Sequence, residues 1–198
     1  MKKKYLLFIA LIIVVTGLTS FIFTRERTNK ITIKQYIPAR VDKVWAVVGE
    51  DFGGIAKTNP NIVSSSLING FERAGEGAER VCNFNYEGTS YIHEKQVDFN
   101  PDNYSFKVKV FHVHGTPLKE EESFAEYKLI PKDANTCELI FSFQYETTPF
   151  FLGDVMKPFM KEDLKDYLVG IQHYVLTGED VNHKNIDHLK QKYDVSSL

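Results

Sequence analysis

Three histidines are the residues of this 198-residue chain whose types and spacing best suit chemistry. His112 and His114 stand two apart in an alternating segment, and His93 lies in the alternating segment before it. Because side chains two apart in a strand share a face, a sheet would bring these imidazoles together, with Tyr91 beside them. Imidazole changes its charge near neutral pH. General acid–base catalysis by His93 or His112, with Tyr91 as partner, is therefore one hypothesis.

A metal site is the second chemistry that three histidines suggest. No carboxylate on the face predicted for the histidines completes a convincing ligand set, so we assign no metal and no cofactor. The alternative is that the histidines line the wet end of a cavity and bond to Tyr91, Tyr127 or water. The sequence contains no serine nucleophile elbow, phosphate-binding loop or dinucleotide fingerprint.

The elements that must position these residues are mostly strands. Alternating segments separated by Gly, Pro, Asn and Asp predict strands at 31–37, 62–68, 79–86, 90–99, 104–113, 123–130 and 137–147. A helix is expected over 39–48. A long amphipathic helix is expected over 154–176, and Pro158 should bend or restart it. Its apolar face, predicted to lie against the sheet, has these members: Val155, Phe159, Leu164, Tyr167, Leu168, Ile171 and Val175. The resulting fold class is α+β, a curved antiparallel sheet of six or seven strands around one long C-terminal helix.

Hairpin turns assign the faces of these strands. A four-residue turn at 100–103 would place the aromatic and histidine side chains of 90–99 and 104–113 on the core face, leaving Glu94, Gln96 and Asp98 in water. A turn at 131–135 pairs Leu129 with Cys137 and predicts an inward face with these members: Ala125, Tyr127, Leu129, Cys137, Leu139, Phe141, Phe143 and Tyr145.

The space between sheet and helix is expected to be a cavity with apolar walls and a few polar groups, as small-molecule sites usually are. The residues predicted to line it are Phe84, Tyr91, His93, Phe106, Val108, His112, His114, Tyr127, Phe141, Phe143, Met156, Phe159, Met160, Leu164 and Leu168.

The N-terminal 24 residues have the composition of a membrane or targeting segment. Lys2 to Lys4 precede 19 uncharged residues, 5–23, about 28 Å as a helix and close to the ~30 Å hydrocarbon thickness. We predict an uncleaved transmembrane helix over 1–24 that holds the domain outside the cytoplasmic membrane. The alternative is a cleaved signal peptide and a secreted domain.

The charge and the cysteine content further narrow the classes of protein to which this chain can belong. Residues 31–198 hold 18 basic and 25 acidic side chains with no basic stripe, so nucleic-acid binding is not expected. Cys82 and Cys137 lie within predicted strands, and we favour two free, buried thiols over a disulfide. The predicted organisation is a segment at 1–24, a linker at 25–30, a domain at 31–177 and a polar tail at 178–198.

Three short stretches of the sequence form motifs: Ile37-Pro38-Ala39 with the following Val44-Trp45, then Asp51-Phe52-Gly53, and then the segment from Gly75 to Arg80. These motifs resemble those of the START and Bet v 1-like helix-grip superfamily, in its polyketide cyclase/dehydrase-type (SRPBCC) branch. The resemblance covers about residues 31–177. It implies a domain that binds hydrophobic ligands such as lipids, sterols or polyketides, and some members catalyse cyclisation or dehydration.

Three functions remain open on the sequence. The first is non-catalytic binding of a hydrophobic small molecule or lipid in the cavity, with the membrane contacted through residues 5–23. The second is a cyclase- or dehydratase-like enzyme that uses the inward histidines. The third is a protein-interaction domain with a filled core, which would have no cavity above ~300 Å³.

Overall fold

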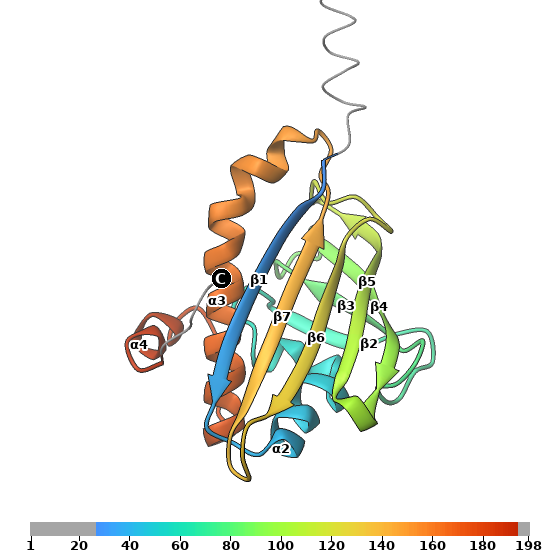
Figure 1. Cartoon of the computed structure of the whole chain (residues 1–198). Coiled ribbons are helices and arrows are strands. Elements are labelled where there is room, and N and C mark those ends of the chain that lie inside the picture. The colour runs from blue at the N-terminus through green and yellow to red at the C-terminus, as the bar shows by residue number, and fades with distance from the viewer. Residues whose placement is uncertain (1–26, 194–198) are drawn as a thin grey trace, which may run out of the picture.

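A seven-stranded antiparallel sheet curves along one long helix in the computed structural model, which describes residues 27–193 (Figure 1). The strand order is β1-β7-β6-β5-β4-β3-β2, so the first and last strands in sequence pair at one end of the sheet. The strands are β1 (Asn29–Ile37), β2 (Ser64–Leu67), β3 (Glu79–Asn83), β4 (Tyr91–Asn100), β5 (Ser105–His114), β6 (Phe124–Pro131) and β7 (Cys137–Tyr145).

The helices lie against one face and one end of this sheet. The long helix is α3 (Phe151–Thr177), and α2 (Val41–Trp45), a π-turn at Ala46–Glu50 and a 3₁₀ turn at Phe52–Lys57 follow β1. Trp45 is buried and packs its ring against Phe99, Tyr104 and Phe106. The predicted α+β class, the strand count and the long C-terminal helix are confirmed.

The β6–β7 hairpin has the inward face that alternation predicts. Tyr127, Leu129, Leu139 and Phe141 all point into the core. The pairing is shifted by two residues, because Leu129 stands opposite Leu139 and Cys137 pairs with Pro131. A shift of two preserves the faces, since side chains alternate with period two. Cys137 and Cys82 are buried and free, as predicted.

The predicted register of β4 and β5 is wrong. Two irregularities interrupt their ladder, one between Val97 and Asn100 and one between His93 and Glu94. Each changes which residues of the two strands stand opposite, so the simple alternation that we assumed does not hold. Consequently Glu94 and Gln96 are buried. The side-chain amide of Gln96 is held there, donating to the Gly49 carbonyl at 3.0 Å.

The first turns of α3 also depart from expectation. Pro158 lies inside one continuous helix that bends in its N-terminal part (Figure 1). Val155 and Phe159, predicted to face the sheet, are 59% and 70% exposed. Beyond them Leu168, Ile171 and Val175 are buried against the sheet as predicted. Only the C-terminal two thirds of this helix serves the core.

The polar segment after α3 is packed through residue 193. It carries a short helix, α4 (Ile186–Lys190), and forms a second small apolar cluster. Val181, Ile186 and Leu189 bury themselves against Val169 on the outer side of α3. The sequence predicted a polar tail over 178–198, and within it three apolar residues are enough to dock this short helix.

The predicted membrane segment at 1–24 lies outside the described residues. From residue 27 to residue 193, no helix is long and apolar enough to cross a membrane.

The packing of α3 against the loop before β2 depends on one close approach of the two backbones, at Gly170. This contact gives a stability prediction. A Cβ at Gly170 would lie 1.9 Å from the Thr58 carbonyl oxygen. Gly170→Ala should therefore lower the free energy of unfolding by at least about 2 kcal/mol, although Ala is the better helix former by about 1 kcal/mol. Urea unfolding measures this, with Lys161→Ala on the same helix as a control expected within about 0.5 kcal/mol of the parent. A stabilised Gly170→Ala variant would contradict this close approach.

Candidate functional site

A cavity of about 220 Å³ lies between the concave face of the sheet and α3. We call it the sheet–helix cavity. Its walls come from β4, β6, β7, α3, the loop before β2, the turn after β3 and the loop before β6, so the fold must be complete before it exists. Its lining residues are Asn59, Asn61, Ile62, Phe84, Ile92, Glu94, Leu118, Ala125, Tyr127, Phe141, Phe143, Met160, Asp163, Leu164 and Tyr167.

Aromatic rings form one wall of this cavity. Tyr127 stacks on Phe106 with ring centres 4.4 Å apart, and Phe141 meets Tyr127 and Tyr167 edge to face. The hydroxyls of Tyr127 and Tyr167 are 3.2 Å apart and share a hydrogen bond. Burial raises the pKa of Tyr167 to about 12 and raises that of Tyr127 as well. Both phenols therefore stay protonated at neutral pH and act as hydrogen-bonding groups, not as bases.

A buried ion pair forms the polar end of the site. Arg80 on β3 donates to the Glu94 carboxylate on β4 at 2.7 Å through Nε and approaches it at 2.6 Å through a terminal nitrogen. The guanidinium also donates to the Phe52 carbonyl at 2.8 Å and lies over the Phe52 ring. Burial, the largest single cause, lowers the pKa of Arg80, but the facing Glu94 carboxylate and the neighbouring Cys82, Tyr127 and Tyr167 together raise it more, so the pKa rises. Both groups are charged, and each neutralises the other.

One polar group at the cavity wall is left without a partner. The side-chain amide nitrogen of Asn61 is buried and has no hydrogen-bond acceptor among residues 27–193. An unpaired buried donor costs about 1–3 kcal/mol, so such groups are uncommon and usually meet a ligand or water. Because Asn61 lines the cavity, a rotation of its side chain would offer this donor to a bound molecule.

The structure assembles only part of the predicted cavity. Six predicted residues line it: Phe84, Tyr127, Phe141, Phe143, Met160 and Leu164. Three more, Phe106, Val108 and Leu168, are buried in the adjoining core. Met156 is half-buried outside the lining and Phe159 is exposed, because both stand on the first turns of α3, which do not face the cavity.

The predicted histidine site is wrong. The irregularity between Val97 and Asn100 turns Tyr91 and His93 of β4 to the outer face. The irregularity between His93 and Glu94 passes over Phe111 of β5 and turns His112 and His114 outward as well. Ile92 and Val113 turn inward instead. The four rings gather on the outer face, with Tyr91 stacked on His114 at 5.3 Å and His93 at 5.2 Å from His112. His112 bonds to Glu120 at 2.9 Å. No group of three or more potential ligands in the described part of the chain is arranged to hold a metal ion.

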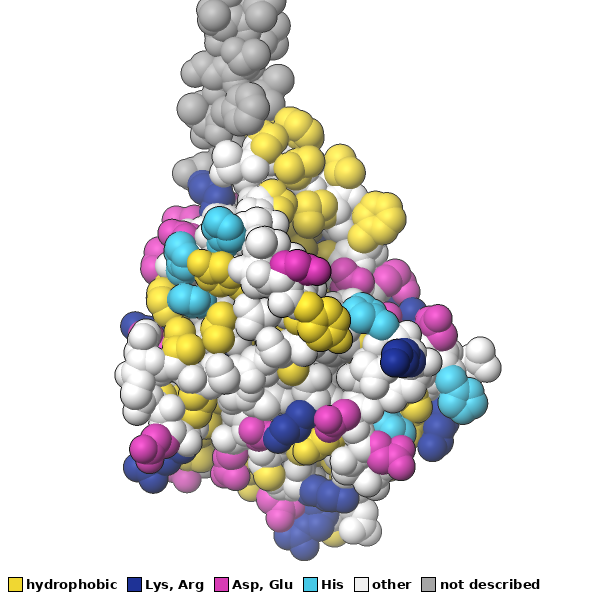
Figure 2. Space-filling view, turned by 180° about the vertical axis from the view of Figure 1, so that it is seen from behind, with side chains coloured by type: hydrophobic (Ala, Val, Ile, Leu, Met, Phe, Trp, Pro, Cys, Tyr) yellow, Lys and Arg dark blue, Asp and Glu magenta, His cyan; other side chains and the backbone are white. Residues whose placement is uncertain are grey.

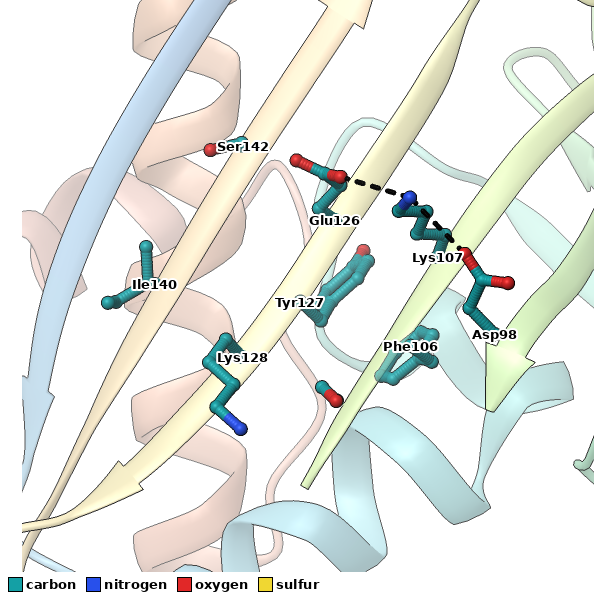
Figure 3. Close-up of a pocket in the computed structure, with 9 residues that line it drawn as sticks. Asp98, Phe106, Lys107, Glu126, Tyr127, Lys128, Ile140 and Ser142 are labelled. Carbon is teal, nitrogen blue, oxygen red and sulfur yellow. Dashed lines mark ion pairs between the residues drawn. The ribbon is translucent and has the colours of Figure 1, made fainter. Parts of the chain in front are cut away.

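A second hollow, of about 270 Å³, lies on the outer face over β5, β6 and β7 (Figure 3). Lys107 stands at its centre, 3.2 Å from Asp98 and 3.5 Å from Glu126. The Asp98 carboxylate is the main cause that raises the pKa of Lys107. These charges are already paired with one another on the wet side of the sheet. The hollow is thus a solvated groove, and the sheet–helix cavity is the better candidate site.

Asn61, Glu94 and Tyr167 are among the site residues that sequence reasoning missed. Tyr167 was on the apolar stripe of the helix, and its hydroxyl gave no separate signal. Glu94 could have been found through Arg80: Arg80 and Cys82 alternate inward on β3, and a buried guanidinium requires a carboxylate on the neighbouring strand. Counting residues back from the predicted turn at 100–103 places the side chain of Glu94 on the solvent face instead.

The architecture is that of a Bet v 1-like helix-grip protein, and similar solved structures show the same fold. Ara h 8.0201 has a TM-score of 0.60 and 20% identity, over 76% of this chain and 99% of its own. Norcoclaurine synthase from Thalictrum flavum, in complex with dopamine and hydroxybenzaldehyde, has a TM-score of 0.58 and 15% identity, covering 79% and 91%. An uncharacterised protein from Bacillus thuringiensis has a TM-score of 0.57 and 19% identity, covering 75% and 99%.

Residues 28–175 match the family described as "Polyketide cyclase / dehydrase and lipid transport". The chain belongs to this family, the SRPBCC group that its motifs resemble, and membership points to hydrophobic ligands. No curated protein matches the sequence.

The buried ion pair gives a prediction that separates pairing from packing. Glu94→Gln removes one charge and leaves the other buried, so the free energy of unfolding should fall by about 3–5 kcal/mol. Replacing both partners, in Arg80→Met with Glu94→Leu, should be less harmful than either single change, because no buried charge remains. Chemical denaturation of the two single variants and the double variant measures the difference. Additive losses would show that the two side chains do not depend on each other.

Proposed function

We propose that this protein binds a small hydrophobic molecule in the sheet–helix cavity. The observation that carries the proposal is the cavity itself, with aromatic walls and a buried amide donor without a partner. Family membership supports the ligand class. The predicted N-terminal segment supports a position at the outer side of the cytoplasmic membrane, where apolar molecules and lipids are at hand.

The size of the cavity limits the ligand. Its volume of about 220 Å³ is below the ~300 Å³ at which drug-sized sites begin, which is also the result expected of the filled-core alternative, so the test below includes that alternative. It exceeds the ~150 Å³ of an engineered apolar cavity that binds benzene. The occupant we expect is therefore of single-ring size, or one short segment of a longer chain. Dopamine and hydroxybenzaldehyde, present in the norcoclaurine synthase complex, are single-ring compounds of this class.

The polar groups indicate what the ligand carries. The Asn61 amide nitrogen needs an acceptor, such as a carbonyl or hydroxyl oxygen. The Tyr127–Tyr167 pair can share a further hydrogen bond, since each hydroxyl has donor and acceptor capacity. Glu94 is neutralised by Arg80, so the site is suited to a neutral molecule. A cyclase or dehydratase using the histidines is not carried forward, because those side chains are on the other face.

The test is ligand-induced stabilisation of the purified full-length chain by 4-hydroxyacetophenone, a single-ring probe with a carbonyl acceptor. At 100 times its dissociation constant a ligand stabilises by about 2.7 kcal/mol, which raises the melting temperature by several degrees. Met160→Trp places a larger side chain in the cavity and should abolish the rise.

The matched control is Met156→Trp, one turn away on the same helix and outside the lining, which should keep the rise. Native mass spectrometry of the parent should also show a co-purified apolar adduct. No stabilisation together with no adduct would support the filled-core alternative. An equal rise in the Met160→Trp variant would place the ligand elsewhere.

A further inference from the structure

An apolar stripe on the first turns of α3 is left uncovered by the rest of the domain. Phe151, Val155 and Phe159 follow one another at intervals of four and are 42%, 59% and 70% exposed. Residues four apart lie on one side of a helix, so the three side chains form a continuous surface. We call it the α3 stripe. Exposed apolar patches of this kind mark interaction sites.

The packing of α3 explains why the stripe faces outward. Gly153 is the buried residue of this part of the helix: a Cβ there would lie 2.5 Å from the Asn29 side chain, and its carbonyl accepts a hydrogen bond from Tyr145 at 2.9 Å. Phe151 and Val155 are each two residues away, about 200° around the helix axis. They therefore point away from the sheet. The contacts at Gly153 hold the stripe out in a fixed orientation.

The position of the stripe relative to the N-terminal segment identifies what covers it. Arg27, the first described residue, forms an ion pair at 3.2 Å with Asp154 in the first turn of α3. The uncharged run ends at Phe23, four residues earlier, and four extended residues span at most ~14 Å. Figure 1 shows that β1 begins beside the start of α3, and Figure 2 shows hydrophobic side chains gathered at that end of the domain.

We propose that the α3 stripe is seated in the surface of the lipid bilayer that holds residues 5–23. A helix with an outward apolar face, tethered within ~14 Å of the membrane, is positioned to sink that face into the headgroup region. Lys157 is exposed beside the stripe and suits anionic headgroups. Asp154 is neutralised by Arg27.

This docking would bring the sheet–helix cavity close to the bilayer. Met160 and Leu164, which line the cavity, follow Phe159 on the same helix. A molecule leaving the headgroup region beside Phe159 would meet the cavity wall within about one turn, ~5 Å along the helix axis. The inference rests on the predicted membrane segment and does not require the cavity to be occupied, so the two proposals can fail separately.

The experiment uses the full chain reconstituted into vesicles of phosphatidylcholine and phosphatidylglycerol that contain brominated phospholipids as quenchers. Trp45 is the single native tryptophan and is buried, so it supplies a constant background. Phe159→Trp reports on the stripe. Leu176→Trp, also exposed but about 25 Å further along the same helix, is the matched control. We expect at least twofold stronger quenching at position 159 than at position 176.

A second variant tests whether the stripe itself causes the contact. Adding Phe151→Glu and Val155→Glu to Phe159→Trp should lower quenching to the level of the control, while the N-terminal segment still holds the chain in the vesicle. Three results would overturn the proposal: a chain that does not float with the vesicles, equal quenching at 159 and 176, or quenching unchanged by the two glutamates. Shielding of position 159 that depends on the protein-to-lipid ratio would assign the stripe to a second copy and would also overturn it.

Discussion

The buried Arg80–Glu94 ion pair is the interaction on which the rest of the site depends. Two opposite charges inside an apolar core are tolerated only when each neutralises the other, so β3 and β4 must present both side chains to the same face. This requirement fixes the phase of β4: once Glu94 is inward, Ile92 and Gln96 are inward too. Arg80 then reaches across to the Phe52 carbonyl and ties the sheet to the turn that follows α2.

The same pair explains which parts of the structure could be predicted from sequence. Strand positions, the long helix and the inward face of β6 and β7 follow from uninterrupted alternation and were within reach. The β4–β5 ladder was not, because its irregularities at Val97–Asn100 and His93–Glu94 leave no mark in the residue pattern. Counting from the turn then assigned Glu94 to water and the histidines to the core. Burial of a paired charge outweighed the preference for aromatic rings inside.

Helix α3 has two structural roles, one at each end. Its C-terminal part buries Leu168, Ile171 and Val175 against the sheet and completes the core. Its first turns are fixed at Gly153 and keep Phe151, Val155 and Phe159 in the open. Met160 and Leu164 lie between the two regions and face the cavity. Helical periodicity predicted one apolar face for the whole helix, but the Gly153 contacts with β1 and β7 turn the apolar side chains of the first turns outward, beside the predicted membrane segment.

The central claim is that the sheet–helix cavity is a binding site and not a packing defect. The measurement that tests it most directly is a crystal structure of the protein purified from cells, with no ligand added. The account predicts electron density of single-ring size between Tyr127 and Leu164, with an acceptor atom within hydrogen-bond distance of the Asn61 amide nitrogen. A cavity closed by the side chains of Met160 and Leu164, with Asn61 bonded to the protein itself, would contradict it.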